Sequence, residues 1–144
     1  MPDGTVAIAA DHAGVELKSK LKEQLEQDGI RVVDLGTDGA ASVDYPDIAN
    51  RLAEAVTSAK AERGIVICGT GIGVSMAANR HPGVRAAVCH DITSARLARQ
   101  HNDANVLALG ARLIGPEVAK DCVATFLNTE FEGGRHAGRV QKLG

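Results

Sequence analysis

The chain has 144 residues, which is enough for one domain with its own core and too few for two. Its 16 Lys and Arg residues nearly balance its 18 Asp and Glu residues, and the net charge of −2 gives no general attraction to nucleic acid or to an anionic membrane. Aromatic residues make up only 2%, which argues against a stacking surface for single-stranded nucleic acid, and no apolar run approaches the roughly 18 residues of a membrane span.

Short apolar runs alternate with helical stretches along the chain. The expected elements, in chain order, are a strand at 5–10, a helix at 14–29, a strand at 30–36, a helix at 45–61, a strand at 64–68, a short helix at 73–81, a strand at 84–90, a helix at 91–102, a strand at 105–110 and a helix at 115–128. Leu17, Leu21 and Leu25 recur every four residues in the first helix, and Gly29 ends it. Asp91 is expected to cap the fourth helix.

The five strands are continuous apolar runs, which is typical of parallel strands covered by helices on both faces. We therefore predict one α/β domain over 1–144, an open doubly wound parallel sheet with the flavodoxin-like strand order 2-1-3-4-5. In this order strands 1 and 3 are neighbours, and a crevice opens at their carboxyl ends. Asp11 and His12 follow strand 1 and Cys68 follows strand 3, so these residues are expected to meet at the crevice.

The loop after the third strand has the sequence CGTGIG at 68–73. Gly69, Gly71 and Gly73 allow a sharp turn that exposes backbone N–H groups, and a helix follows directly. The loop is a candidate site for a phosphate or a developing oxyanion. It matches no dinucleotide, Walker or Cys-x5-Arg phosphatase pattern. A tight strand-to-helix turn without a ligand is the alternative.

The three cysteines form an odd set without metal-ligand spacing, which indicates reduced thiols in a cytoplasm. Cys122 shares an apolar helix face with Val118 and Phe126 and is expected to be a small buried hydrophobe. Cys68 admits the same interpretation, but its place before a helix suits a base or a nucleophile. A regulatory pair of Cys68 and Cys89 stays open, whereas no C-x-x-C motif is present.

Arg135 and Arg139 are four residues apart, so on a helix they share a face and repel each other unless an anion lies between them. Guanidinium groups suit phosphate, and Gly133 with Gly134 could bend the segment 131–144 over a site. The alternative is a solvated basic tail.

The histidines differ in context. His12 and His101 lie among polar residues at the ends of predicted elements, whereas His81, His90 and His136 are interpreted as surface or packing residues. No set of His, Cys and carboxylate side chains has zinc-ligand spacing, so we predict no metal.

Five stretches together closely resemble the ribose-5-phosphate isomerase B family. They are DHAG at 11–14, DYPD at 44–47, CGTGIGVSMAANR at 68–80, RQHNDANVLALGAR at 99–112 and EGGRHAGRV at 132–140. The family includes isomerases of ribose 5-phosphate, galactose 6-phosphate and allose 6-phosphate. One branch uses a glutamate base just beyond the last glycine; position 74 is valine here, so this chain is similar to the cysteine branch.

The resemblance implies a cofactor-free and metal-free aldose–ketose isomerase that acts through a cis-enediolate, and the reduced thiols lead us to expect it in the cytoplasm. It implies catalytic roles for Cys68 as the base, Thr70 as its support and His101 in ring opening. It implies substrate contacts from Asp11, His12, Tyr45, Gly69, Gly71, Gly73, Asn102, Arg112, Arg135 and Arg139. Family members are homodimers or homotetramers with shared active sites, and His101, Asn102 and Arg112 are expected to come from the neighbour of the subunit that provides Cys68.

Two other functions stay open from the sequence. An isomerase of six-carbon sugar phosphates would use the same motifs with a deeper pocket. A non-catalytic module that binds a sugar phosphate or a nucleotide would need the glycine loop and the arginines but not the thiol.

Overall fold

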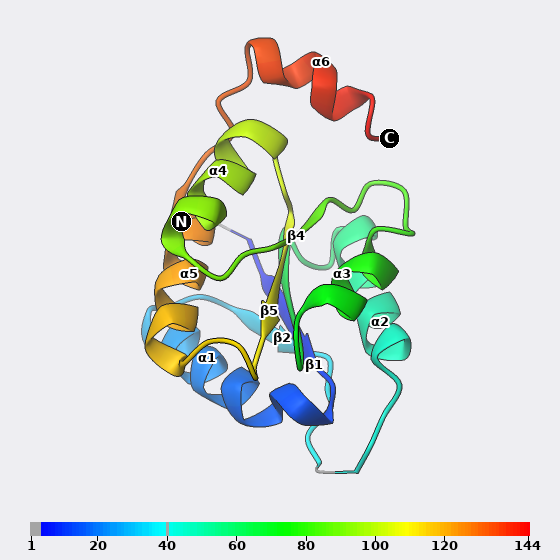
Figure 1. Ribbon diagram of the computed structural model, residues 1–144, viewed down its shortest axis with the longest axis vertical. Coiled ribbons are helices and arrows are strands. Elements are labelled where there is room, and N and C mark those ends of the chain that lie inside the picture. The colour runs from blue at the N-terminus through cyan, green and yellow to red at the C-terminus, as the bar shows by residue number, and fades with distance from the viewer. Residues whose placement is uncertain (1–3, 40) are drawn as a thin grey trace.

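Five short parallel strands form one sheet in the computed structural model, which describes residues 4–39 and 41–144. They are β1 (Val6–Ala10), β2 (Val32–Asp34), β3 (Arg63–Cys68), β4 (Ala86–Val88) and β5 (Val106–Gly110). The spatial order is β2-β1-β3-β5-β4, with every neighbouring pair parallel (Figure 1). The predicted class of fold is confirmed, and so is the contact between strands 1 and 3.

The predicted order of the last two strands is wrong, because β5 and not β4 lies beside β3. All five residues of β5 are buried and pair along β3 from Gly64 to Cys68. The three residues of β4 are only partly buried, and they pair with β5 alone. A short strand exposes few unpaired backbone groups, which suits it to the edge of a sheet. Both stretches are apolar in sequence, so composition alone did not distinguish the central strand from the edge strand.

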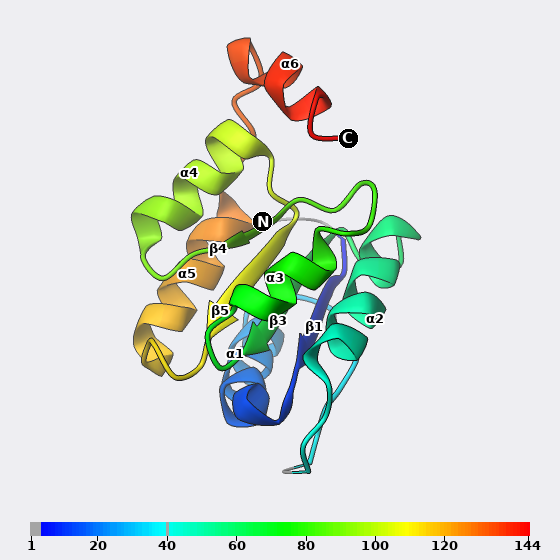
Figure 2. The ribbon, with the colours of Figure 1, turned by 45° about the vertical axis from the view of Figure 1, so that its right-hand side comes forward.

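Helices cover both faces of the sheet. They are η1 (His12–Gly14), α1 (Val15–Gln27), α2 (Tyr45–Thr57), α3 (Ile72–Ala78), α4 (Ile92–Asn102), α5 (Pro116–Asn128) and α6 (Arg135–Gln141). One core joins the sheet to α1, α4 and α5, and a second core joins it to α2 and α3 (Figure 2). The Asp91 carboxylate caps α4 as expected, accepting a hydrogen bond from Ser94 N at 2.6 Å.

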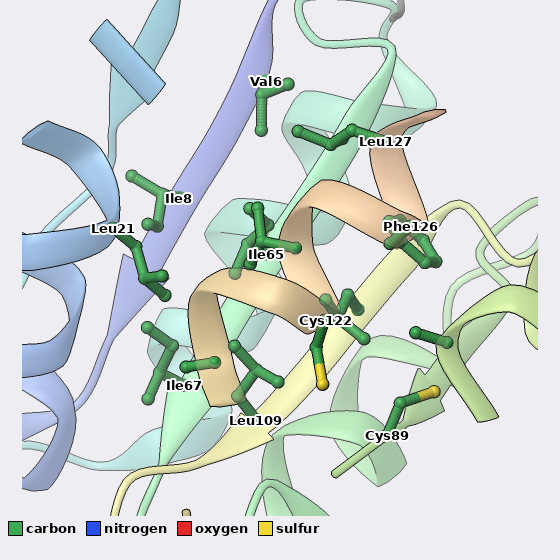
Figure 3. Packing of buried hydrophobic residues seen from close by; sticks show 14 of the residues in the cluster. Val6, Ile8, Leu21, Ile65, Ile67, Cys89, Leu109, Cys122, Phe126 and Leu127 are labelled. Carbon is green, nitrogen blue, oxygen red and sulfur yellow. The ribbon is translucent and has the colours of Figure 1, made fainter. Parts of the chain in front are cut away.

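The first core contains the apolar side chains that the sequence pattern places on α1 and α5. Leu21 of α1 and Phe126 of α5 pack against strand residues such as Ile65 (Figure 3). Cys122 is fully buried there, as expected, whereas Val118 is 41% exposed. The buried face of α5 begins one residue later, at Ala119. Within the described ranges, every helix is too short or too polar to cross a membrane.

Candidate active site

The carboxyl ends of β1 and β3 bring Asp11 and Cys68 side by side. Ala10 pairs with Ile67 in the sheet, and Asp11 N donates a hydrogen bond to Ile67 O at 3.0 Å. The chain leaves both strands at this edge, which is where doubly wound sheets bind ligands. Asp11 and Cys68 therefore meet at the ends of neighbouring strands, as the sequence predicts.

The Cys68 side chain lies under the glycine loop. Its sulfur accepts a hydrogen bond from Gly71 N at 3.1 Å, and only 6% of the residue is exposed. Gly71 has φ = +78°, and a Cβ there would lie 2.9 Å from the carbonyl carbon of Leu109. Glycine is therefore required both by the backbone conformation and by the close approach of β5. The turn directs a backbone N–H at the thiol and then opens into α3.

The support that the resemblance assigns to Thr70 is given to the loop and not directly to the Cys68 sulfur. Thr70 Oγ1 accepts a hydrogen bond from Ile72 N at 3.2 Å, in the first turn of α3. The hydrogen bond to the sulfur comes from Gly71 instead. Thr70 therefore supports the loop that holds Cys68.

Asp11 and His12 are both held by backbone N–H groups. The buried Asp11 carboxylate accepts from Ala13 N at 3.0 Å. His12 Nδ1 accepts from Val43 N at 3.2 Å. An Nδ1 that accepts a hydrogen bond carries no proton, so the neutral ring carries its proton on Nε2. His12 is thus oriented to donate from Nε2 to a ligand.

Tyr45 and Arg112 lie against two glycines of the loop. The Tyr45 ring, 43% exposed, packs on Gly73, where a Cβ would lie 2.6 Å from Tyr45 Cε1. A Cβ on Gly69 would lie 3.4 Å from Arg112 Cδ and Nη1. The expectation that Arg112 comes from a neighbouring subunit relative to Cys68 is therefore wrong. The turn after β5 places Arg112 beside the loop of its own chain, where its N donates to Gly69 O at 3.0 Å.

We call this group of residues the strand-end half-site. Its members share the carboxyl edge of the sheet: Asp11, His12, Tyr45, Cys68, Gly69, Thr70, Gly71, Gly73 and Arg112.

The remaining predicted residues gather elsewhere, around a cavity of about 360 Å³. We call them the helix-end half-site: His101, Asn102, Arg135 and Arg139. The rings of His101 and His136 stack there with centroids 4.5 Å apart. Burial and the positive charges of His101 and Arg135 lower the pKa of His136. A lowered pKa favours the neutral form of His136, so the permanent positive charge of the cavity comes from the two exposed arginines. This charge suits an anion.

The two half-sites of one chain lie at opposite edges of the sheet. In this fold α4 runs antiparallel to the strands, so its last residues, His101 and Asn102, lie near the strand starts. The loop after α4 meets β3 there, where Gly64 N donates to Asn105 O at 2.9 Å. The six residues of β3 span about 20 Å between the two edges. Figures 1 and 2 both show α6 beyond the end of the sheet opposite to η1. One chain therefore does not bring His101 to its own Cys68.

A family model described as Ribose/Galactose Isomerase matches residues 6–143. Ribose-5-phosphate isomerase B of Escherichia coli strain K12 is 46% identical over 138 residues, which are 96% of this chain and 93% of that protein. This chain belongs to the ribose/galactose isomerase family. D-erythrulose-4-phosphate isomerase of Pectobacterium atrosepticum, another relative, is 48% identical over 141 residues, 97% of this chain and 93% of that protein.

A solved structure of ribose-5-phosphate isomerase B from Clostridium thermocellum superposes on this member of the family with a TM-score of 0.96. The two are 54% identical, and the match covers 97% of this chain and 95% of the other. The chain is thus an enzyme of the aldose–ketose isomerase class that acts on sugar phosphates. The alternative of a non-catalytic binding module is set aside.

Sequence reasoning missed the position of His90 in this isomerase. His90 Nε2 accepts a hydrogen bond from Gly110 N at 3.1 Å. Gly110 lies against the glycine loop, since a Cβ on it would be 2.6 Å from Thr70 O. His90 therefore fixes the end of β5 on which the loop rests, although nothing in the sequence near His90 signals this partner.

Replacing His90 with alanine is expected to lower the free energy of unfolding by about 1–3 kcal/mol, because the N–H of the buried Gly110 loses its acceptor. The activity should fall as well, because the glycine loop loses part of its support. His90→Gln keeps an acceptor oxygen and should recover most of both losses. Urea unfolding and kcat, measured on both variants, check this; equal damage in the two would show that the hydrogen bond is not the cause.

The three thiols differ in their surroundings. Cys68 belongs to the core under α2 and α3, whereas Cys89 and Cys122 belong to the core under α4 and α5. A Cys68–Cys89 pair would have to cross the sheet, which disfavours that hypothesis. Burial raises the pKa of the Cys89 thiol, and burial also raises the pKa of Cys122 to about 11. Both are therefore uncharged and weakly nucleophilic near neutral pH.

Iodoacetamide at neutral pH is accordingly expected to label Cys68 before Cys89 and Cys122. Peptide mass spectrometry over time gives the order of labelling directly. Labelling of Cys122 first would mean that the core opens faster than the glycine loop exposes its thiol.

Proposed function

We propose that the enzyme interconverts ribose 5-phosphate and ribulose 5-phosphate, with Cys68 as the base that moves a proton between C2 and C1. The observation that carries this proposal is the placement of the thiol at the carboxyl edge of the sheet, beneath a glycine loop whose Gly71 N–H donates to the sulfur. A proton beside a sugar carbonyl is weakly acidic, so its removal needs a base and a stabilised oxyanion. A positioned base contributes roughly 10²–10⁴-fold, and one oxyanion donor about 10²–10³-fold.

The proposed reaction starts from the open-chain aldose. The Cys68 thiolate takes the proton from C2, and the C–H electron pair forms the C1–C2 double bond as O1 becomes the enediolate oxygen. That charge is stabilised by backbone N–H groups of the Gly69–Gly73 loop other than those of Gly71 and Ile72, which donate to Cys68 Sγ and Thr70 Oγ1. The thiol then returns the proton to C1 while the O2 proton passes to O1, with Asp11 accepting and donating at the hydroxyls. The ketose results without any other reactant.

We further propose that each active site joins the strand-end half-site of one chain to the helix-end half-site of a second. His101 and Asn102 of the second chain would then reach the sugar, and His101 would protonate the ring oxygen during opening. Arg135 and Arg139 of the second chain would hold the phosphate together with His12 and Arg112 of the first. The separation of about 20 Å along β3 within one chain supports this arrangement. It requires a homodimer or a higher homo-oligomer.

The sugar that this enzyme prefers is tested by comparing substrates of different length. Ribose 5-phosphate is expected to have the highest kcat/KM. The six-carbon alternative would put allose 6-phosphate or galactose 6-phosphate first. The relative from Pectobacterium atrosepticum makes D-erythrulose 4-phosphate a specific second candidate. One carbon in a fitted pocket is worth about 10–200-fold in kcat/KM, so sugar phosphates with four, five and six carbons should separate clearly. A higher value for any of the other three would replace the proposed substrate and leave the chemistry in place.

A further inference from the structure

Three side chains with metal-ligand chemistry converge beside the helix-end cavity. Glu132 Oε1 lies 3.5 Å from His136 Nε2 and 4.0 Å from His101 Nε2. The three ligand atoms all lie within 4.8 Å of one another. His101 comes from the last turn of α4, His136 from α6 and Glu132 from the segment before α6. Glu132 and His136 are four residues apart, but His101 is distant in sequence, so the spacing alone does not reveal the cluster of three.

The distances between the three ligand atoms can be compared with those of a zinc site. Zinc holds nitrogen and carboxylate oxygen at about 2.0–2.2 Å in a tetrahedron, so its ligand atoms lie about 3.4 Å apart. The ligand atoms have to move closer together, and one imidazole has to turn, because a bound ion lies in the plane of each ring whereas the rings of His101 and His136 are stacked at an interplanar angle of 17°. The His101 side chain is 40% exposed and has room for this turn. The Glu132 side chain is half exposed and can move toward the ion, and its backbone is fixed by the hydrogen bond from Glu132 N to Gln100 O at 3.1 Å. Three protein ligands beside an open cavity leave a fourth position for water or an anion.

The charges around the cluster limit which ion fits. Arg135 and Arg139 line the same cavity and oppose any cation by Coulomb repulsion. An ion held mainly by charge, such as magnesium, is therefore disfavoured. Zinc and its neighbours in the first transition row bind imidazole strongly, and the one carboxylate of Glu132 adds a negative ligand.

We propose that His101, Glu132 and His136 bind a zinc-class divalent ion, and that the bound ion inhibits the isomerase. The inhibition rests on the function proposed above, because the ion occupies the His101 nitrogen assigned to ring opening. The binding itself depends only on the geometry of the cluster.

Binding is tested with Co²⁺ by its visible absorption and with Zn²⁺ by calorimetry, on the intact enzyme. Glu132→Gln and His136→Ala should each weaken the affinity by a factor on the order of 10–100 or more. The matched control is Glu130→Gln, which removes an exposed carboxylate two residues away and should leave affinity unchanged. Absence of binding by wild type, or equal binding by Glu132→Gln, would overturn the proposal.

Inhibition is tested in the same variants, because zinc could also attack the Cys68 thiol. The proposal predicts that Zn²⁺ competes with the sugar phosphate in wild type and Glu130→Gln, and that its inhibition constant rises at least tenfold in Glu132→Gln. Equal inhibition of Glu132→Gln would assign the effect to the thiol and contradict the inhibitory role. If no sugar phosphate is isomerised, the proposed function fails, while the Co²⁺ and Zn²⁺ titrations still decide the metal site.

Discussion

Replacement of Cys68 by alanine is expected to lower kcat for isomerisation by a factor on the order of 10²–10⁴, while KM stays within a few-fold of wild type. The thiol is proposed to contact only the proton that is transferred. Its loss should therefore raise the free energy of the transition state and leave substrate binding nearly unchanged. The phosphate contacts proposed for Arg135 and Arg139 lie elsewhere and are kept. Steady-state kinetics with ribose 5-phosphate measure both constants.

The matched control is Cys122→Ala, which removes a buried thiol from the opposite core. It should lose stability through the cavity it leaves but keep its kcat. Unchanged kcat in Cys68→Ala would mean that another group is the base. A large rise in KM alone would mean that Cys68 holds the loop in place and does no chemistry.

Mixing two inactive variants is expected to restore activity, which is the second large effect. Cys68→Ala damages the strand-end half-site and His101→Ala the helix-end half-site. If each site joins two chains, a mixed dimer has one site with both residues intact and one with neither. Random pairing of equal amounts in a symmetric dimer then returns about one quarter of the wild-type activity.

The two variants are co-refolded from denaturant and assayed beside each refolded alone. Recovery well above the sum of the two separate activities supports shared sites. A mixture no more active than its parts would place both residues in one chain and contradict the proposed pairing of half-sites.

Periodicity in the sequence predicted most of the fold. Leucines four apart and apolar runs of five residues translate directly into α1 and the buried strands, because local burial decides both. The meeting of Asp11 and Cys68 followed from the general rule for open α/β sheets. The positions of β4 and β5 did not follow, because both stretches are apolar in sequence and the difference in burial between them appears only in the assembled sheet.

The site could be predicted only in part, since its finer contacts join side chains to distant backbone groups. Val43 N on His12 and Gly110 N on His90 are partners 31 and 20 residues away, and a backbone N–H has no residue-type signal. The cluster of His101 and His136 depends on how α6 packs against α4. Arg112 was misplaced because a resemblance of motifs does not say from which chain a side chain arrives.

Isomerisation of ribose 5-phosphate in D₂O tests the central claim most directly, because it follows the proton assigned to Cys68. Removal of that proton by a thiolate predicts deuterium at C1 of the ribulose 5-phosphate and at C2 of the ribose 5-phosphate recovered at equilibrium, and no comparable incorporation with Cys68→Ala. Product that stays free of deuterium after many turnovers, or incorporation at the wild-type rate in Cys68→Ala, would contradict the account.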